Sequence, residues 1–171
     1  MMNIQYPYLP EGRTIDYVPF SNEFMRGAYE YSKQHSSDRN HPTGAVVVKD
    51  NKIIGRGANQ VPVKNEFLKR VHKDWICVRK ILKIKSGEKY WLCPGCAKCE
   101  DHGEQQAVRD AIKNVGDISG ADLYLWGHWW CCESCWNAMI APGIRDVYLV
   151  EGSEILFDKN NPANKLGRFE V

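Results

Sequence analysis

His102-Gly103-Glu104 and, further along the chain, Cys132-Glu133-Ser134-Cys135 each stand where the sequence predicts the first turn of a helix. One imidazole and two thiolates are three ligands of a tetrahedral zinc site, and they leave the fourth position to water. Glu104 is well placed to move protons on that water. Helix N-termini carry partial positive charge, so they favour thiolate over thiol. These residues predict a catalytic zinc with His102, Cys132 and Cys135 as ligands and Glu104 as the proton carrier.

A purely structural metal site is the alternative for the same three ligands. A structural site would be closed by a fourth ligand from the protein. Glu104 would then have no task, and two predicted helix starts would converge on one point by chance. The sequence therefore favours the catalytic interpretation.

The composition is typical of a globular protein. The 171 residues are 43% apolar and 26% charged, which fits a single domain over residues 1–171. The apolar runs are too short to cross a bilayer, and the first residues lack the basic start and apolar stretch of a signal peptide. We therefore expect a cytoplasmic protein without a membrane partner. The seven cysteines, several of them in C-x-x-C spacing, favour metal ligation over a disulfide framework.

Apolar spacing and turn residues predict alternating helices and strands. Residues 1–19 contain three prolines and are expected to form an irregular arm. Ser21 is the candidate N-cap of the first helix and Asp101 that of the helix with Glu104, while Asp50-Asn51 should close a hairpin. The expected order is a helix from Phe20, strands at 44–48 and 53–55, a loosely helical segment at 64–85, a loop at 91–101, a helix from 102, a strand at 122–126, a helix from 132 to Pro142, a strand at 146–150 and a polar tail. This order predicts an α/β fold in which helices pack on both faces of a sheet.

The chain resembles the cytidine/deoxycytidylate deaminase superfamily from Asn22 to Val150. The residues that carry this resemblance are Thr43-Gly44-Ala45-Val46-Val47-Val48, Gly57-Ala58-Asn59, both halves of the zinc motif and Gly143-Ile144-Arg145-Asp146-Val147-Tyr148. Shorter matches resemble the deoxycytidylate deaminase branch, and they are Cys77-Val78-Arg79, Ser86-Gly87-Glu88, Cys93 and His102-Gly103-Glu104-Gln105-Gln106-Ala107.

The resemblance implies a three-layer α/β/α fold around a mixed five-stranded sheet. It also implies a zinc-dependent hydrolase that removes an exocyclic amine from a base, and assembly as a homo-oligomer. By the same resemblance, Asn59 contacts the sugar or its substituent, and the backbone N–H of Gly103 faces the base carbonyl. A plain turn residue after a strand is the alternative for Asn59.

The chain departs from the usual pattern of this superfamily in three places, the last of which is a pair of adjacent tryptophans. Gly103 stands where alanine is usual, which leaves backbone N–H groups available. Cys131 replaces a proline and adds a thiol that could compete for zinc, although the C-x-x-C spacing favours Cys132. Trp129 and Trp130 replace smaller residues and could stack a pyrimidine, with Trp130 the nearer of the two. The alternative is that a tryptophan belongs to the core or to an oligomer contact.

Residues 60–100 are expected to form a basic and cysteine-rich insert. Nine Lys or Arg stand against three acids in residues 64–89, which fits a phosphate group, with a solvated helix face as the alternative. Three cysteines within seven residues also suit a zinc knuckle. We expect a second, structural zinc, and its candidate ligands are Cys77, Cys93, Cys96 and Cys99. His72 or His128 could replace one of these cysteines, and Cys77 could instead be a small buried apolar residue.

Three functions fit these features. The favoured interpretation is hydrolysis of the 4-amino group of a cytosine nucleotide, dCMP to dUMP and ammonia, with the basic segment near the 5′-phosphate. A polynucleotide deaminase that acts on tRNA or single-stranded DNA would also use stacking tryptophans and positive charge. A zinc-stabilised interaction module without catalysis is the third, and Glu104 beside an open zinc position argues against it.

Overall fold

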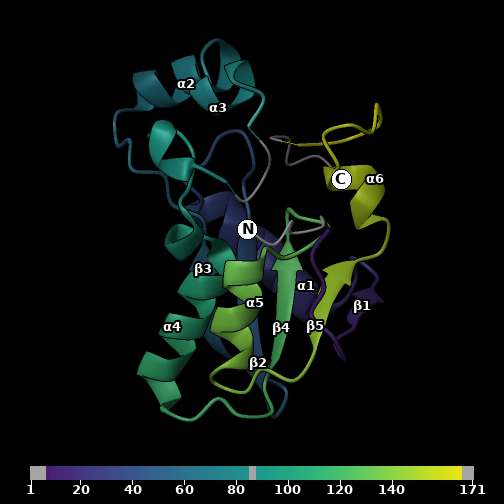
Figure 1. The fold of residues 1–171 in the computed structure, drawn as a ribbon. Helices are drawn as coiled ribbons and strands as arrows, with labels where there is room; N and C mark the ends of the chain where they lie inside the picture. Colours follow the sequence, from purple (N-terminus) through teal and green to yellow (C-terminus); the bar gives the residue numbers. More distant parts are fainter. Residues whose placement is uncertain (1–6, 85–87, 167–171) are drawn as a thin grey trace.

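A mixed five-stranded sheet in the order β1-β5-β4-β2-β3 forms the middle of the molecule (Figure 1). The computed structural model describes residues 7–84 and 88–166, so Lys85 of the basic segment and Ser86-Gly87 lie outside the described residues. The strands are β1 (Ile15–Val18), β2 (Gly44–Lys49), β3 (Lys52–Ala58), β4 (Asp122–Trp126) and β5 (Val147–Val150). Strands β1, β5 and β4 run parallel, and β2 runs antiparallel to both β3 and β4. The expected mixed five-stranded sheet is therefore confirmed.

Helices cover both faces of this sheet, which confirms the three-layer α/β/α arrangement. The helices are α1 (Glu23–His35), α2 (Glu66–Asp74), α3 (Val78–Ile81), α4 (Gly103–Val115), α5 (Glu133–Ile140) and α6 (Ser153–Phe157), with short 3-10 turns η1 (Tyr90–Leu92) and η2 (Cys99–Asp101). Because side chains alternate along a strand, Val46 and Val48 of β2 pack with α1, whereas Ala45 and Val47 pack with α4 and α5. Each face of the sheet thus has its own apolar core.

The hairpin between β2 and β3 is confirmed where the sequence predicted it. Asp50 and Asn51 both have positive φ, at 50° and 60°. Two consecutive residues in this region form the two-residue turn whose twist matches that of paired strands. Asn and Asp tolerate this conformation better than most residues other than glycine.

Three local predictions were wrong. Residues 15–18 of the predicted irregular arm form β1, an edge strand that pairs with β5. Asn22 caps α1 instead of Ser21, because its Oδ1 accepts hydrogen bonds from two backbone N–H groups of the first turn, at 3.0 and 3.1 Å. His102 stands at the N-cap of α4 instead of Asp101, because Asp101 already belongs to the preceding 3-10 turn η2.

One end of the sheet collects most of the loops that the motifs occupy. Strands β3, β4 and β5 end there and β2 begins there, since β2 is antiparallel to its neighbours. The helices α2, α3 and α6 lie beyond this same end (Figure 1). Parallel strands commonly place ligand sites outside their carboxyl ends. A ligand site is therefore expected at this end of the sheet.

Candidate active site

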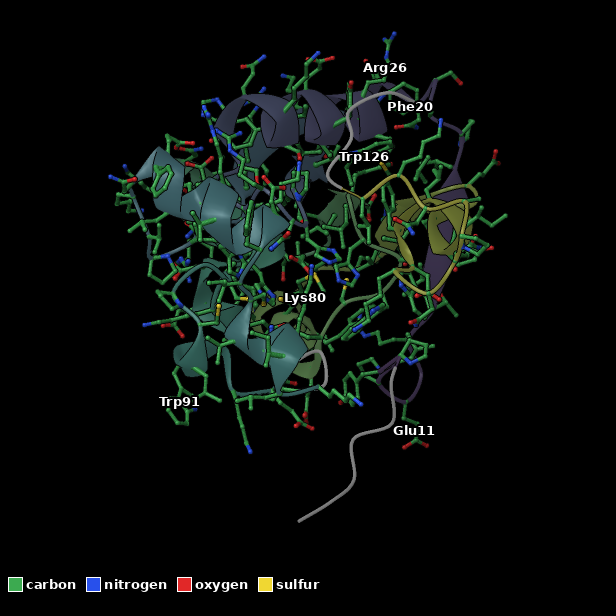
Figure 2. All side chains as sticks on the ribbon, turned by 90° about the horizontal axis from the view of Figure 1, so that it is seen from above. Glu11, Phe20, Arg26, Lys80, Trp91 and Trp126 are labelled. Atoms are coloured by element: carbon green, nitrogen blue, oxygen red, sulfur yellow. The ribbon has the colours of Figure 1, made fainter. Side chains whose placement is uncertain are left out.

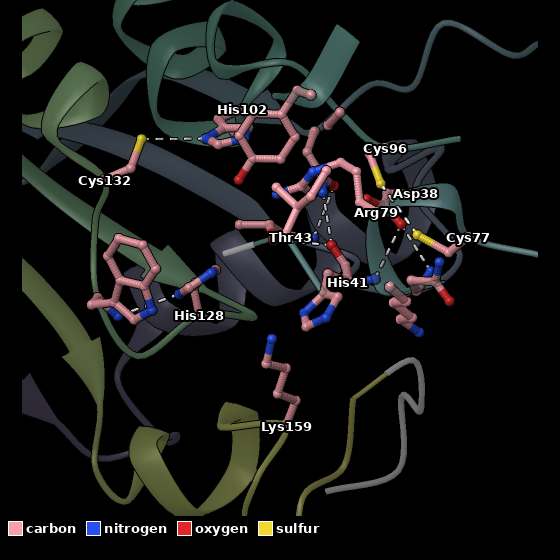
Figure 3. A pocket seen from close by; sticks show the side chains of 18 of the residues that line it. Asp38, His41, Thr43, Cys77, Arg79, Cys96, His102, His128, Cys132 and Lys159 are labelled. Carbon is pink, nitrogen blue, oxygen red and sulfur yellow. Dashed lines mark hydrogen bonds between the residues drawn. The ribbon is translucent and has the colours of Figure 1, made fainter. Parts of the chain in front are cut away.

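His102, Cys132 and Cys135 meet at the starts of α4 and α5, and we call them the three-ligand cluster. His102 and Cys132 are the two N-cap residues, and Cys135 lies in the first turn of α5. The Nδ1 atom of His102 is 3.7 Å from the Sγ atom of Cys132 (Figure 3) and 3.5 Å from the Sγ atom of Cys135. The prediction that both motif halves open helices is confirmed.

These separations fit a tetrahedral zinc ion. With ordinary Zn–N and Zn–S bond lengths, a tetrahedral ion holds an imidazole nitrogen and a thiolate sulfur ~3.6 Å apart. The three ligand atoms of the cluster all lie within 4.8 Å of one another. Cys131 is outside this group, so the C-x-x-C pair supplies the two thiols that face His102.

Close packing of α4 on β3 holds His102 at this end of the sheet. A Cβ atom at Gly57 of β3 would overlap the backbone of α4 at Ala107 and Gly103. Only glycine at this position lets the helix lie so near the strand. The first turn of α4, with His102 before it and Glu104 within it, is thereby fixed next to the end of β3.

Glu104 lies beside the three-ligand cluster and is buried, with 4% of its surface exposed. Its carboxylate contacts the thiols of Cys135 and Cys131. A hydrogen bond with Cys132 lowers the pKa of Cys135, but burial and the Glu104 carboxylate raise it, and the net pKa is about 12. A buried carboxylate next to metal-ligand thiols is well placed for proton transfer.

Gln105 supports the same cluster, and the sequence analysis did not single it out. Its Nε2 atom donates to Ser134 Oγ at 2.9 Å and reaches Cys135 Sγ at 4.0 Å. Donors to ligating sulfurs orient the ligands and tune the metal. The position of Gln105 in the sequence does not predict this role, because the contact joins α4 to α5, which are distant in the sequence.

A cavity of about 470 Å³ opens beside the cluster (Figure 3). Trp130 lines it and is 7% exposed, whereas Trp129 packs into the apolar cores on both faces of the sheet. His128 lies edge-on to the Trp130 ring, with centroids 5.1 Å apart. Other residues of the cavity wall are His41, Thr43, Asn59, His102, Gly103, Glu104 and Cys132.

His128 is a neutral imidazole in this wall. Burial, together with the neighbouring His41 and His102, lowers its pKa to about 3. Its Nδ1 atom faces the backbone N–H groups of Trp129 and Trp130, at 3.1 and 3.4 Å. Because Nδ1 accepts, the ring proton belongs on Nε2, which is then a donor.

Asn59 follows β3 and holds the loop that leads into β2. Its Oδ1 accepts from Ser36 Oγ at 2.6 Å and from the Thr43 N–H at 3.0 Å. Its Nδ2 donates to the His41 carbonyl at 2.7 Å. Asn59 lines the cavity and is 5% exposed. Its side chain therefore fixes part of the cavity wall.

Four cationic side chains reach the same cavity. Arg79, Lys80 and Lys83 come from the α3 region of the basic insert, and Lys159 comes from the segment after α6. Figure 2 shows Lys80 over the middle of the molecule, and Figure 3 shows the Lys159 ammonium pointing between His41 and His128. The basic segment was expected near a phosphate, but no sequence signal marked Lys159.

A second group of metal-binding side chains lies in the insert, and we call it the four-ligand cluster. Its members are His72, Cys77, Cys93 and Cys96, with ligand atoms all within 4.8 Å of one another. Neither Cys99 nor His128 belongs to it. Cys99 instead shares a hydrogen bond with Cys132, which together with burial raises the pKa of the Cys99 thiol. Cys99 begins the turn η2, and His102 directly follows that turn, so Cys99 lies near the other cluster.

Two further expectations concern disulfide bonds and membrane-spanning segments. All seven cysteines are free thiols. Among the residues that the structure describes, no helix is both long and apolar enough to cross a membrane.

Comparison with known proteins places this geometry in a family. Residues 19–151 match the family model for the cytidine and deoxycytidylate deaminase zinc-binding region. Deoxycytidylate deaminases of Pongo abelii and Homo sapiens are 31% and 30% identical over 134 residues, or 77% of this chain. The match spans 65% of the length of each of these relatives. The apo crystal structure of the dCMP deaminase from cyanophage S-TIM5 is 21% identical, with a TM-score of 0.46 over 81% of this chain and 89% of that one. Because the family model covers most of the chain, the protein belongs to the family of the cytidine and deoxycytidylate deaminase zinc-binding region.

Proposed function

We propose that the protein is a zinc-dependent deaminase that converts dCMP to dUMP and ammonia. The observation that carries this proposal is one cavity whose wall contains two members of the three-ligand cluster, the carboxylate of Glu104 and four cationic side chains. The cluster with Glu104 suits hydrolysis of an exocyclic amine. The cations suit a phosphate group on the same small molecule. The deoxycytidylate deaminases that match 77% of the chain support this choice of substrate.

The three-ligand cluster is the proposed catalytic zinc site. His102, Cys132 and Cys135 would hold the ion, which would supply a water of lowered pKa as the nucleophile. Glu104 takes one proton from the attacking water and delivers it to the ring nitrogen, and it then takes the second proton of that water and delivers it to the leaving amine. Burial of its carboxylate keeps this proton transfer apart from bulk water.

The remaining wall of the cavity positions the base and the phosphate. The Trp130 ring offers an apolar surface for the pyrimidine, and the backbone N–H at Gly103 is the proposed donor to its carbonyl. Arg79, Lys80 and Lys159 are proposed to hold the 5′-phosphate by charge-assisted hydrogen bonds. The contact between Asn59 and the sugar stays a prediction, and the three hydrogen bonds of Asn59 give it a positioning role as well.

Ammonia release from a panel of substrates tests the activity. The panel is dCMP, deoxycytidine, dCTP, guanine, single-stranded DNA and tRNA, each at low and high salt. We expect the highest kcat/KM with dCMP. Faster turnover of the polynucleotides, with affinity that falls steeply as salt rises, would support the polynucleotide alternative and overturn the dCMP assignment. Absence of ammonia from every substrate would leave the non-catalytic interaction module.

Replacement of Lys159 by Met tests the phosphate contact. Loss of one hydrogen bond to a charged group should raise KM for dCMP by about 10- to 100-fold and change KM for deoxycytidine little. Lys49→Met is the matched control, because Lys49 pairs with Asp117 at 3.3 Å and does not line the cavity. Equal KM values of the Lys159 variant and the wild type for dCMP would refute the contact.

Three expectations stay predictions: a single domain over residues 1–171, a cytoplasmic location and a homo-oligomer. The insert gives the oligomer some support, because large apolar side chains are exposed on it. They are Phe67, Leu68, Trp75, Ile76, Ile81, Leu82 and Trp91, and Figure 2 shows Trp91 at the outer edge of the molecule. Exposed apolar patches often mark contacts between chains. Light scattering of the pure protein measures the mass that decides this.

A further inference from the structure

The four-ligand cluster gathers a complete set of metal ligands from three segments of the insert. His72 lies in the last turn of α2, Cys77 caps α3, and Cys93 and Cys96 enclose the loop after η1. His72, Cys77 and Cys93 are buried, and Cys96 is half-buried. Among the described residues between β3 and α4, no helix or strand is longer than the nine residues of α2.

The distances in the cluster fit a tetrahedral zinc ion. Such an ion separates two thiolate sulfurs by ~3.8 Å and a sulfur from an imidazole nitrogen by ~3.6 Å. The Sγ atoms of Cys77 and Cys96 are 3.8 Å apart, and Cys96 Sγ is 3.6 Å from His72 Nε2. Three thiolates and one imidazole also form a donor set that selects zinc over harder cations.

The surroundings of His72 hold its ring for ligation through Nε2. The Nδ1 atom of the ring lies 3.0 Å from the amide of Asn40. Ligation through Nε2 leaves the ring proton on Nδ1, so the Asn40 amide must turn its oxygen toward Nδ1 to accept that proton, as the partners of ligating histidines usually do. Gly95 lies directly against the ring, because a Cβ atom there would overlap the His72 side chain. The loop between the two cysteines is thus shaped around the imidazole.

The charge around the cluster is balanced by Arg79. Zinc with three thiolates and a neutral imidazole carries one net negative charge. The Arg79 side chain hydrogen-bonds the Cys96 sulfur, and its guanidinium stacks on the Tyr90 ring at 4.0 Å. Tyr90 in turn lies edge-on to the His102 ring, with centroids 5.5 Å apart. Backbone N–H groups of Gly95 and Val78 also point at the Cys93 sulfur. These contacts link the cluster to the cavity wall.

We propose that His72, Cys77, Cys93 and Cys96 bind a structural zinc ion that holds α3, with Arg79 and Lys80, against the cavity. All four positions of this site are filled by protein ligands, so it has no open position for substrate. The two apolar cores of the sheet include none of the insert's described residues, and the ion instead joins the end of α2 to the start of α3. The positioning effect on substrate rests on the proposed function, whereas the metal site itself does not.

Metal content and sulfur coordination of the pure full chain test the site. We expect about two zinc ions per chain, with X-ray absorption giving about 2.5 sulfur neighbours per zinc. Cys93→Ser should keep about one zinc, bound by two sulfurs, and Cys135→Ser should keep about one, bound by three. Cys99→Ser should keep both ions. One zinc in the wild type and in Cys93→Ser alike would overturn the proposal.

Gly95→Ala provides a variant that removes no ligand. The added methyl group overlaps the His72 ring, so we expect loss of about one zinc per chain. Gly27→Ala is the matched control, because its Cβ would meet only side chains, at 3.2 and 4.0 Å, and it should keep both ions. If Gly95→Ala folds and keeps both ions with unchanged sulfur coordination, His72 is not a ligand.

Other occupants of the cluster would also overturn the proposal. A Cys77–Cys96 disulfide, detected by mass spectrometry without reduction, would remove two of the ligands. Visible absorbance from bound iron would show that the cluster holds a different metal from zinc. In the Cys93→Ser variant we expect KM for dCMP to rise at least about 10-fold with a smaller change in kcat. If the metal counts agree but no substrate is deaminated, the structural zinc stands and the proposed function fails.

Discussion

The three-ligand and four-ligand clusters use the same ligand types but have neighbours of opposite charge. Two thiolates and an imidazole leave a divalent ion neutral with one position open, and the buried carboxylate of Glu104 lies beside it. Three thiolates and an imidazole close the shell and leave one negative charge, and the guanidinium of Arg79 lies beside that cluster. The difference separates two tasks. In the proposed function, the acid next to the open site moves protons, whereas the cation next to the closed site compensates charge and faces the cavity.

Among the substitutions that test this comparison, replacement of Glu104 by Gln is expected to have the largest effect on the protein. Gln keeps the shape of the side chain but cannot carry the proton, so kcat should fall by about 10³-fold while the zinc content stays unchanged. Steady-state kinetics and metal analysis measure the two quantities. Glu100→Gln is the control, because Glu100 is exposed and outside the cavity wall. A Glu104→Gln enzyme with wild-type kcat would place the proton transfer elsewhere.

The three-ligand cluster could be predicted from the sequence because its information is local. His102 precedes Glu104 by two residues, Cys132 precedes Cys135 by three, and each pair opens one helix. The four-ligand cluster was predicted with one wrong member. Cys99 has the right spacing to Cys96, but the turn η2 carries it toward Cys132. The fourth member is instead His72, which reaches the cluster from α2. The sequence analysis gave His72 only as an alternative ligand.

The fold shows the same difference: elements set by local sequence could be predicted, and elements set by contacts between distant residues could not. Strands β2, β4 and β5 are apolar runs between turns and could be placed to within about two residues. Strand β1 has only four residues and follows two prolines, and only its pairing with β5 makes it a strand. Lys159 likewise enters the cavity because the chain folds back after α6, which no spacing in the sequence indicates.

Asn59 lies in the wall that the two clusters share, so its loss is expected to affect both. Asn59→Ala leaves Thr43 N–H, Ser36 Oγ and the His41 carbonyl without this partner, and the free energy of unfolding should fall by about 2–4 kcal/mol. Urea unfolding measures it. Asn137→Ala, at an exposed site on α5, should cost less than about 1 kcal/mol. Equal stability of the two variants would show that these hydrogen bonds do not hold the loop.

A third test concerns the neutral His128, which lines the cavity beside the three-ligand cluster. Its folded pKa of about 3 lies below the ordinary value of 6.5, so the folded state loses stability as pH falls from 6.5 toward 3. The loss attributable to this ring is at most about 1.4 kcal/mol per pH unit. His128→Asn keeps an acceptor for the backbone N–H groups and should flatten the dependence of unfolding free energy on pH between about 5 and 6.5. His35→Asn, on the exposed surface of α1, should leave the slope unchanged. Parallel slopes for His128→Asn and wild type would mean that His128 is not kept neutral by burial.

The smallest expected effect is at Gly103, next to the open cluster. A Cβ atom there would meet Thr43 O at 3.4 Å, Gly57 O at 3.5 Å and Ala45 N at 3.6 Å, which are ordinary contact distances. Because alanine also favours the helix, Gly103→Ala should raise the free energy of unfolding by about 0.5 kcal/mol. Gly57→Ala, on the strand below, should instead lower it, because its Cβ overlaps helix backbone. If both substitutions destabilise the protein equally, α4 is held as tightly at its first residue as over β3. The backbone at the helix start beside the three-ligand cluster would then tolerate an added methyl group no better than the backbone at Gly95 beside the four-ligand cluster.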